Sequence, residues 1–301
     1  MVDDDEMTRA SAVLRGVLYL ARPDAPSAAL TETARGIAER AGREEEPRQA
    51  LAQAAGLTLT RAGNDRLNLA EANLAWADLA LAGLVGADLA GANLTRAVLA
   101  GAELAGADLA GADLTRSILA EAVLTGAVLA GADLAGATLN RATLTGADLT
   151  GAVLAGTTLS GADLTGAVLG EADLAGARLD RADLTGADLI GADLAGANLT
   201  RAVLAGAELL RATLTRATLT GADLTFADLT GADLTGADLT GANLALARLD
   251  QVNLASVTWG IRTTAWPAAI ADRVLAGSDE IEPGVYRVRG GSSPDRSVVL
   301  V

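Results

Sequence analysis

GADLTFADLTGADLTGADLT, residues 221–240, contains four copies of a five-residue unit in which a carboxylate stands directly before a leucine. Helices repeat near 3.6 residues and strands every two, so a period of five indicates a larger repeating unit. This leucine, here called the central leucine, returns at every fifth position from Leu69 to Leu254 without a break. The register defines 38 units over residues 66–255.

Two positions of the unit are apolar and vary little. Alanine stands two residues before the central leucine in all but four units, where Leu67, Ser117, Thr157 and Val252 replace it. Residues two apart in an extended segment face the same side, so this alanine and the leucine can both point inward. Five residues cannot enclose a core alone, but short sides joined by tight corners can wind into stacked coils around a leucine column.

The unit A-[DN]-L-x-x resembles the pentapeptide repeat family. The resemblance implies an all-β solenoid, a right-handed, four-sided parallel β-helix with four units in each coil. It covers residues 66–255, which are about two-thirds of the chain. Because strands stack roughly 4.8 Å apart, nine to ten coils would form a rod about 45 Å long.

The repeat segment carries most of the charge, with 22 acidic and 10 basic residues in a chain of net charge −15. The position before the central leucine supplies 17 of these acids and is expected to point outward. When successive units are assigned to four sides, eleven of the 17 fall on two adjacent sides. The first side takes Asp88, Asp108, Asp148, Asp188, Glu208 and Asp228, and the second takes Asp113, Asp133, Asp173, Asp193 and Asp233. The third side takes Asp78 and Asp238, and the fourth takes Glu103, Asp163, Asp183 and Asp223.

These eleven carboxylates are the predicted partner-binding residues. They give one charge per roughly 4 Å of rod, close to one phosphate per 3.4 Å of a DNA strand. The quinolone-resistance members of the family are understood as DNA-shaped acidic rods that occupy the DNA-binding saddle of DNA gyrase and topoisomerase IV. The resemblance therefore implies a non-enzymatic DNA mimic that binds a bacterial type II topoisomerase, in resistance or self-protection.

An alternative function is a structural or adaptor rod that binds another protein partner. Asp or Asn before the leucine is the general consensus of the family, and such residues can serve solubility and corner hydrogen bonds alone. The acidic surface by itself leaves both functions open.

The N-terminal segment, residues 1–65, is predicted to be a helical cap. Apolar residues recur at helical spacing in residues 7–21 and 27–42, and Pro47 can open a third short helix. The end of a solenoid exposes leucines and unpaired strand edges, so a cover is expected there.

The C-terminal segment, residues 256–301, is predicted to be a mixed cap. A helix is expected from Pro267 to Gly277, and residues 284–289 and 297–301 have the composition of short strands. The apolar lid of this cap is assigned to Trp259, Trp266, Ile270 and Val274. The resemblance implies that this end can also form a homodimer, with the same residues at its seam.

Composition argues against most catalytic chemistry. The chain contains no Cys and no His, and exposed stacked carboxylates lack the buried surroundings that separate the pKa values of an acid–base pair. The repeat also lacks the G-G-x-G-x-D pattern of calcium-binding β-helices. We therefore expect no enzyme, no cofactor and no metal. With an acidic N-terminus and no apolar run of about 20 residues, a cytoplasmic protein is expected, with no membrane contact and no direct nucleic-acid binding.

Overall fold

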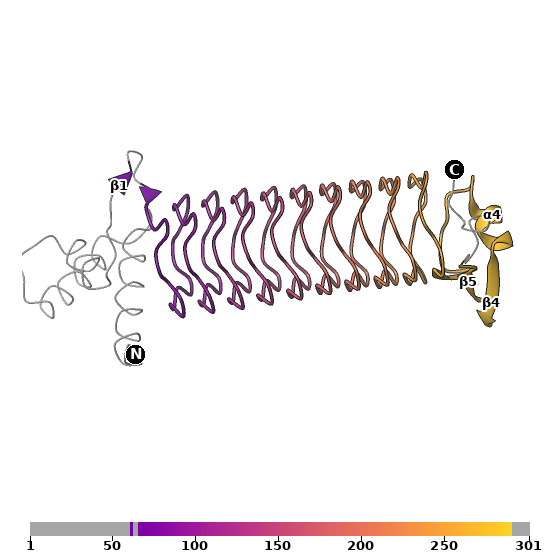
Figure 1. The fold of residues 1–301 in the computed structure, drawn as a ribbon, viewed down its shortest axis with the longest axis horizontal. Coiled ribbons are helices and arrows are strands. Elements are labelled where there is room, and N and C mark those ends of the chain that lie inside the picture. The colour runs from indigo at the N-terminus through magenta and orange to yellow at the C-terminus, as the bar shows by residue number, and fades with distance from the viewer. Residues whose placement is uncertain (1–60, 63–65, 291–301) are drawn as a thin grey trace, which may run out of the picture.

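The computed structural model describes residues 61–62 and 66–290. Within these residues the chain forms a rod of stacked coils that ends in a small α/β unit (Figure 1). At the N-terminal end of the rod, strands β1 (Arg61–Ala62) and β2 (Arg66–Leu67) pair antiparallel. The helices predicted for the N-terminal cap lie outside the described residues.

Each coil of the rod contains four repeat units. Parallel bridges join each residue before a central leucine to its equivalent twenty positions later, from Asn68↔Asp88 to Asp238↔Thr258. Twenty residues are four units, so the rod has four sides, and each side contributes one bridged residue per coil. The predicted solenoid of parallel β-structure is confirmed.

Every backbone N–H of a typical unit has a partner, which explains why so short a repeat can propagate. In the unit 87–91, three N–H groups donate to carbonyl oxygens of the two neighbouring coils at 2.6–2.9 Å. The N–H of Ala87 closes the preceding corner by donating to Leu84 O at 3.0 Å. The fifth N–H, that of Ala90, donates to Asp88 Oδ1 at 3.2 Å.

The corners are tight turns that place one residue in the left-handed region. The second residue after each central leucine has φ between +56° and +75° at all 38 corners from Glu71 to Ser256. With the corner hydrogen bond, this φ is typical of a type II turn. Glycine adopts it readily and occupies 22 corners, whereas the other 16 hold a side chain where non-glycine residues are uncommon.

The core is the leucine column inside the coils. The central leucines from Leu69 to Leu254 are at most 6% exposed, and the alanines two residues earlier complete the inner surface. Two of the replacements for alanine are polar and fully buried. Ser117 Oγ donates to Leu114 O at 2.6 Å, and Thr157 Oγ1 makes the equivalent bond, so both hydroxyls are satisfied.

The ladder continues past residue 255. Val257 and Trp259 are buried and occupy the places of the alanine and the central leucine in a further unit. The side ladders extend to Thr258, which bridges Asp238, and to Ala265, which bridges Asn243. Asn243 and Ala265 are two residues further apart in the sequence than one coil, so the regular repeat ends between these two bridges.

A three-stranded antiparallel sheet and one helix follow. Strand β3 (Thr258–Gly260) pairs with β5 (Val285–Val288), which pairs with β4 (Ser278–Glu282), and helix α4 (Ala271–Ala276) precedes β4. Because Thr258 also bridges the last full coil, the third side of the rod runs directly into this sheet.

Two predictions for this segment are corrected. The helix expected from Pro267 to Gly277 begins at Ala271, after a turn in which Pro267 O accepts from the N–H groups of Ile270 at 3.0 Å and Ala271 at 3.2 Å, and it closes at Gly277 as predicted. The strand expected at 284–289 is β5, but it pairs with β3 and with β4, a strand that was not predicted. The second expected strand, residues 297–301, lies outside the described residues.

Candidate partner-binding surface

A local hydrogen bond positions each aspartate of the surface. Every Asp before a central leucine, fifteen in the described repeat, accepts a bond through Oδ1 from the N–H of the residue after that leucine, as in Asp108 with Ala110 at 3.0 Å. The six Asn residues at the same position accept the same bond. This is the Asx turn, in which the side chain mimics a backbone acceptor. It orients the carboxylates along the rod.

The structure brings the eleven predicted carboxylates together in two neighbouring columns. On the first side the bridges join Asp88 to Asp108 and Glu208 to Asp228, with Val128 and Val168 interrupting the column. On the second side the acids alternate with Asn, Val and Thr in the same way. The predicted grouping of residues by side is therefore the one that the ladders show.

Threonine strengthens the acidity of several of these carboxyl groups. The Thr115 hydroxyl donates to Asp113 at 2.5 Å and lowers the pKa of that carboxyl below 3.8, although burial acts in the opposite direction. The Thr115 N–H and the Thr95 hydroxyl also donate to this carboxylate. The pKa of Asp163 is lowered by the same arrangement with Thr165 and Thr145. These groups stay ionised at neutral pH.

At the C-terminal end of the first side, an arginine contributes to the lowered pKa of an aspartate. Burial raises the pKa of Asp228, but hydrogen bonds from Thr230 and the charge of Arg248 outweigh it and lower the pKa below 3.8. Arg248 lies one coil further along this side, with its Nη1 3.1 Å from Asp228 Oδ2. The first acidic column therefore ends in a cation.

The arginines of the rod gather around the third side, a feature that the sequence analysis missed. Seven arginines occupy corners of the described repeat, and six of the seven flank the third side. They are Arg96, Arg116 and Arg216 on one edge of that side, and Arg141, Arg181 and Arg201 on the other. Grouping the corner residues by side, as was done for the acids, would have revealed this distribution. The first, second and fourth sides of the rod are thus acidic, and the third side is bordered by arginine on both edges.

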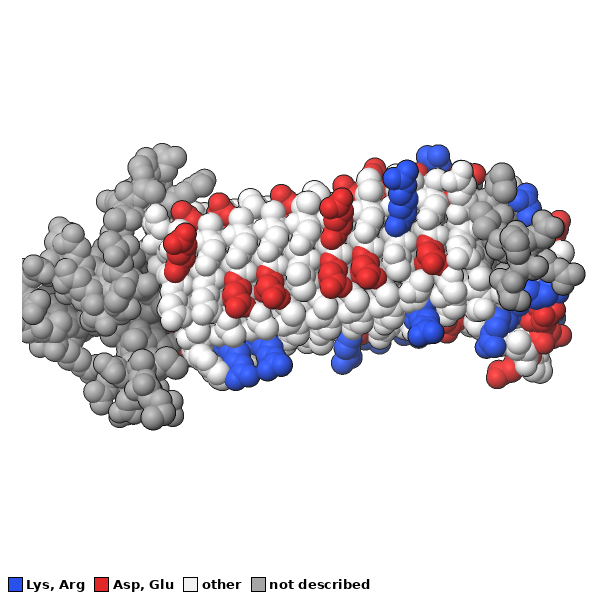
Figure 2. Space-filling model, viewed as in Figure 1, with Lys and Arg blue, Asp and Glu red and all other residues white. Residues whose placement is uncertain are grey.

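The corner between the fourth and first sides lacks this basic border. Seven consecutive coils place glycine there, from Gly86 to Gly206. The acids of the fourth side are therefore separated from those of the first by a smooth edge. Figure 2 shows rows of acidic side chains along the rod, with basic side chains mostly along one edge of the visible face.

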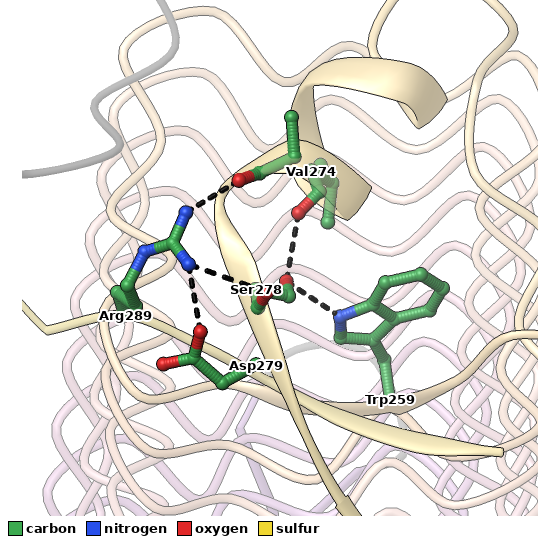
Figure 3. Close-up of polar contacts among 6 residues, drawn as sticks. Trp259, Val274, Ser278, Asp279 and Arg289 are labelled. Carbon is green, nitrogen blue, oxygen red and sulfur yellow. Dashed lines mark hydrogen bonds and ion pairs between the residues drawn. The ribbon is translucent and has the colours of Figure 1, made fainter.

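The four residues assigned to the C-terminal lid lie together at the end of the core. Trp259 is 3% exposed and packs edge-on against Trp266, with 6.0 Å between ring centroids. Trp266 and Ile270 are half-buried against the hydrophobic core, and Val274 is fully buried. Ser278 links this group, because its Oγ accepts from Trp259 Nε1 at 3.0 Å and donates to Val274 O at 2.7 Å (Figure 3).

Charged side chains line the strand at the outer edge of this unit. Strand β4 carries Asp279, Glu280 and Glu282, all exposed, and Arg289 Nη1 contacts Asp279 Oδ1 at 2.7 Å (Figure 3). Charges on an edge strand discourage pairing with a second sheet. The homodimer remains a prediction, and pairing of β4 with its copy would bring like charges together.

The described residues offer little for other chemistry. No group of three or more Asp or Glu side chains within residues 61–62 and 66–290 is arranged to hold a metal ion. In the same part of the chain, no helix has the length and apolar character required to span a membrane. The surface features of this region are its charge columns and twelve exposed large apolar side chains.

Comparison with known proteins finds the same repeat elsewhere. Eight copies of the family described as Pentapeptide repeats match residues 82–119, 107–146, 117–156, 147–186, 182–221 and 219–254, which together span more than half of the chain. No curated protein matches. Among solved structures, HetL of the cyanobacterium Nostoc sp. PCC 7120, a pentapeptide repeat protein involved in heterocyst differentiation regulation, is 37% identical. The similarity covers 63% of this chain and 88% of HetL, with a TM-score of 0.30. The plasmid-mediated fluoroquinolone resistance protein QnrB1 is 19% identical over 56% of this chain and 96% of its own, with a TM-score of 0.42.

Proposed function

This chain belongs to the pentapeptide repeat family, a family of right-handed β-helices, and we propose that it acts by binding and mimics duplex DNA. Its proposed partner is a bacterial type II topoisomerase, DNA gyrase or topoisomerase IV, whose DNA-binding surface is basic. The proposed contact residues are the eleven carboxylates of the first and second sides.

The observation that carries this proposal is the regular pair of acidic columns. Successive coils stack about 4.8 Å apart, so the rod is roughly 45 Å long. Eleven carboxylates over this length approach the charge spacing of one DNA strand. The Asx turns hold the aspartates in place before a partner arrives, so little side-chain entropy is lost on binding. A rigid line of anions is the feature of DNA that a basic groove recognises without reading sequence.

Folding alone does not require so much charge. The Asx turn uses only Oδ1, and an asparagine provides the same acceptor, as Asn93 and Asn198 show. The repeat nevertheless uses Asp fifteen times and Asn six times at this position. Charge of one sign destabilises a compact structure through self-repulsion. The excess of carboxylates therefore supports a role in binding.

Replacing four acids of the first side by their amides tests the proposal. Asp108→Asn, Asp148→Asn, Asp188→Asn and Asp228→Asn together keep the Oδ1 acceptor and remove four charges. We expect the parent to inhibit DNA supercoiling by purified gyrase, less strongly at higher salt, and the variant to need about tenfold more protein.

A matched control removes the same charge from around the third side. Asp78→Asn, Glu121→Gln, Asp180→Asn and Asp238→Asn together leave the first and second sides unchanged, and we expect inhibition close to that of the parent. Equal weakening by both variants would show a response to net charge alone. No inhibition by the parent at any concentration would reject the topoisomerase mimic.

The alternative, an adaptor rod for another protein, is favoured by the Asx turns themselves. They account for Asp and Asn before the leucine without any partner. If gyrase activity is unaffected by the parent, this alternative becomes the better explanation of the fold.

A further inference from the structure

The corner line between the fourth and first sides changes character near the C-terminal end of the rod. After seven glycines, from Gly86 to Gly206, the next two coils place Phe226 and Leu246 at this corner. Both side chains are exposed, at 66% and 67%. Here they are called the apolar pair, and they occupy consecutive coils about 4.8 Å apart.

The apolar pair does not serve the fold at this corner. Phe226 has φ of +60° and Leu246 of +63°, a region that bulky side chains occupy only under constraint. The bond between coils from Phe226 N to Ala245 O is 3.4 Å long, whereas the equivalent bond from the seven glycines of this line is 2.8–3.0 Å. Other corners with bulky side chains, such as Trp76 and Leu81, keep this bond at 2.9 Å, so the longer bond belongs to the end of the regular repeat. The two exposed side chains gain little burial there.

The surroundings indicate what kind of partner could cover this pair. Around Phe226 the corner joins two acidic sides, with Asp223 on one flank and Asp228 on the other, whereas Leu246 in the next coil lies between Asn243 and Arg248. A duplex or a membrane of anionic lipid would be repelled by these columns. Charge complementarity instead favours a protein with a basic groove that has an apolar pocket at one end.

A charge column that repeats with every coil cannot define its own position. Each shift by one coil presents nearly the same pattern of anions, as happens when proteins slide along DNA. An apolar side chain that fits one pocket breaks this equivalence. We infer that Phe226 and Leu246 anchor the rod in a basic groove of its protein partner and fix its position along that groove. This inference rests on the proposed function and adds a site outside the eleven carboxylates.

The test is the double variant Phe226→Gly with Leu246→Gly, measured for direct binding to DNA gyrase holoenzyme. Glycine suits the positive φ, so we expect the melting temperature to be equal or higher. We expect gyrase affinity to fall about tenfold, a typical loss for buried aromatic anchors. The dependence of affinity on salt should stay unchanged, because no charge is removed.

Two further variants make the result specific. Phe226→Asn with Leu246→Asn keeps side chains that tolerate positive φ but removes the apolar surface, so it should lose affinity equally. Leu81→Gly removes a leucine of equal exposure and similar φ from the corner between the third and fourth sides, and it should bind like the parent.

The outcomes separate the two proposals. If the parent binds gyrase and both double variants bind equally well, the anchor is wrong and the proposed function stands. If the variants also show a changed salt dependence, or if Leu81→Gly loses as much affinity, the anchor is likewise rejected. If the parent itself does not bind gyrase, the proposed function and the anchor both fail.

Discussion

The aspartate before each central leucine joins local structure to surface charge. One carboxylate oxygen accepts from the N–H of the residue after the leucine, which would otherwise depend on water. The charge of the same carboxylate faces outward. Threonine after the leucine adds a second donor to several of these carboxylates. The repeat therefore couples the strength of its corners to the ionisation of its surface.

The bond between Thr115 and Asp113 provides a residue-scale test of this coupling. Thr115→Ala removes the hydroxyl donor, so the pKa of Asp113 should rise towards 3.8, as measured by NMR titration of the carboxyl group. Since the folded pKa lies below the ordinary value, the stabilisation is complete above pH 3.8 and is lost as the pH falls through the folded pKa.

The effect of Thr115→Ala on the free energy of unfolding should depend on pH in the same way. The free energy of unfolding at pH 7 should fall by less than about 1 kcal/mol, because the group is only partly buried and solvent screens its charge. The difference from the parent should shrink at pH 3. The control is Thr125→Ala. The residue before the leucine in that unit is Val123 and not a carboxylate, so this change should leave the pKa of Asp113 unchanged. An unchanged pKa in Thr115→Ala would exclude the bond in solution.

At the scale of elements, the C-terminal unit continues the coil it follows. Trp259 stands in the register of the central leucines and carries the aromatic cluster with Trp266 and Tyr286. Strand β3 belongs to the ladder of the third side and to the antiparallel sheet at once. The end of the leucine column is thus packed by a side chain that is also part of the repeat.

Trp259→Ala tests how far this unit supports the rod. Removing a buried aromatic side chain and its bond to Ser278 should lower the free energy of unfolding by about 3–5 kcal/mol, measured by urea denaturation. Trp259→Leu restores the residue type of the register and should cost clearly less. If both variants unfold like the parent, the tryptophan does not belong to the cooperative core.

The repeat could be predicted from the sequence because 38 units enforce one register, so an inward leucine and an outward acid follow for every coil. The C-terminal unit follows no period, and its details were missed for local reasons. Strand β4 is the charged segment SDEIE, which has little strand character and pairs only because β5 lies beside it. Helix α4 starts late because Pro267 begins a turn. The sides on which the acids lie were predicted correctly from the residue before each leucine. The arginine border and the apolar pair stand at the corners, so that assignment does not reveal them.

On the scale of the whole molecule, the rod is a chain of neighbour contacts around one column. Each coil packs only on the coils before and after it, so stability depends on an unbroken stack. The charge distribution is likewise a property of the stack, since single units carry at most a few charges. Acidic sides and arginine edges emerge only when the coils are aligned.

Leu164→Ala tests the continuity of the column. Leu164 is fully buried at the middle of the rod, so a cavity there should lower the free energy of unfolding by about 2–5 kcal/mol. The adjacent change Asp163→Asn keeps its Oδ1 acceptor but loses the bond from the Thr145 hydroxyl to Oδ2, so it should cost about 0.5–1.5 kcal/mol, less than the cavity. A loss confined to Asp163→Asn would place the column on the wrong face of the chain.

The twenty-residue coil also decides which changes in length such a rod can accept. Insertion or deletion of one whole coil would lengthen or shorten it by about 4.8 Å and leave every downstream face pointing as before. Insertion of a single unit would rotate everything downstream by a quarter of a revolution and set acidic faces above arginine borders. Variation in rod length that preserves the surface must therefore come in steps of four units. One coil is therefore the smallest change in length that leaves the surface pattern of the rod intact.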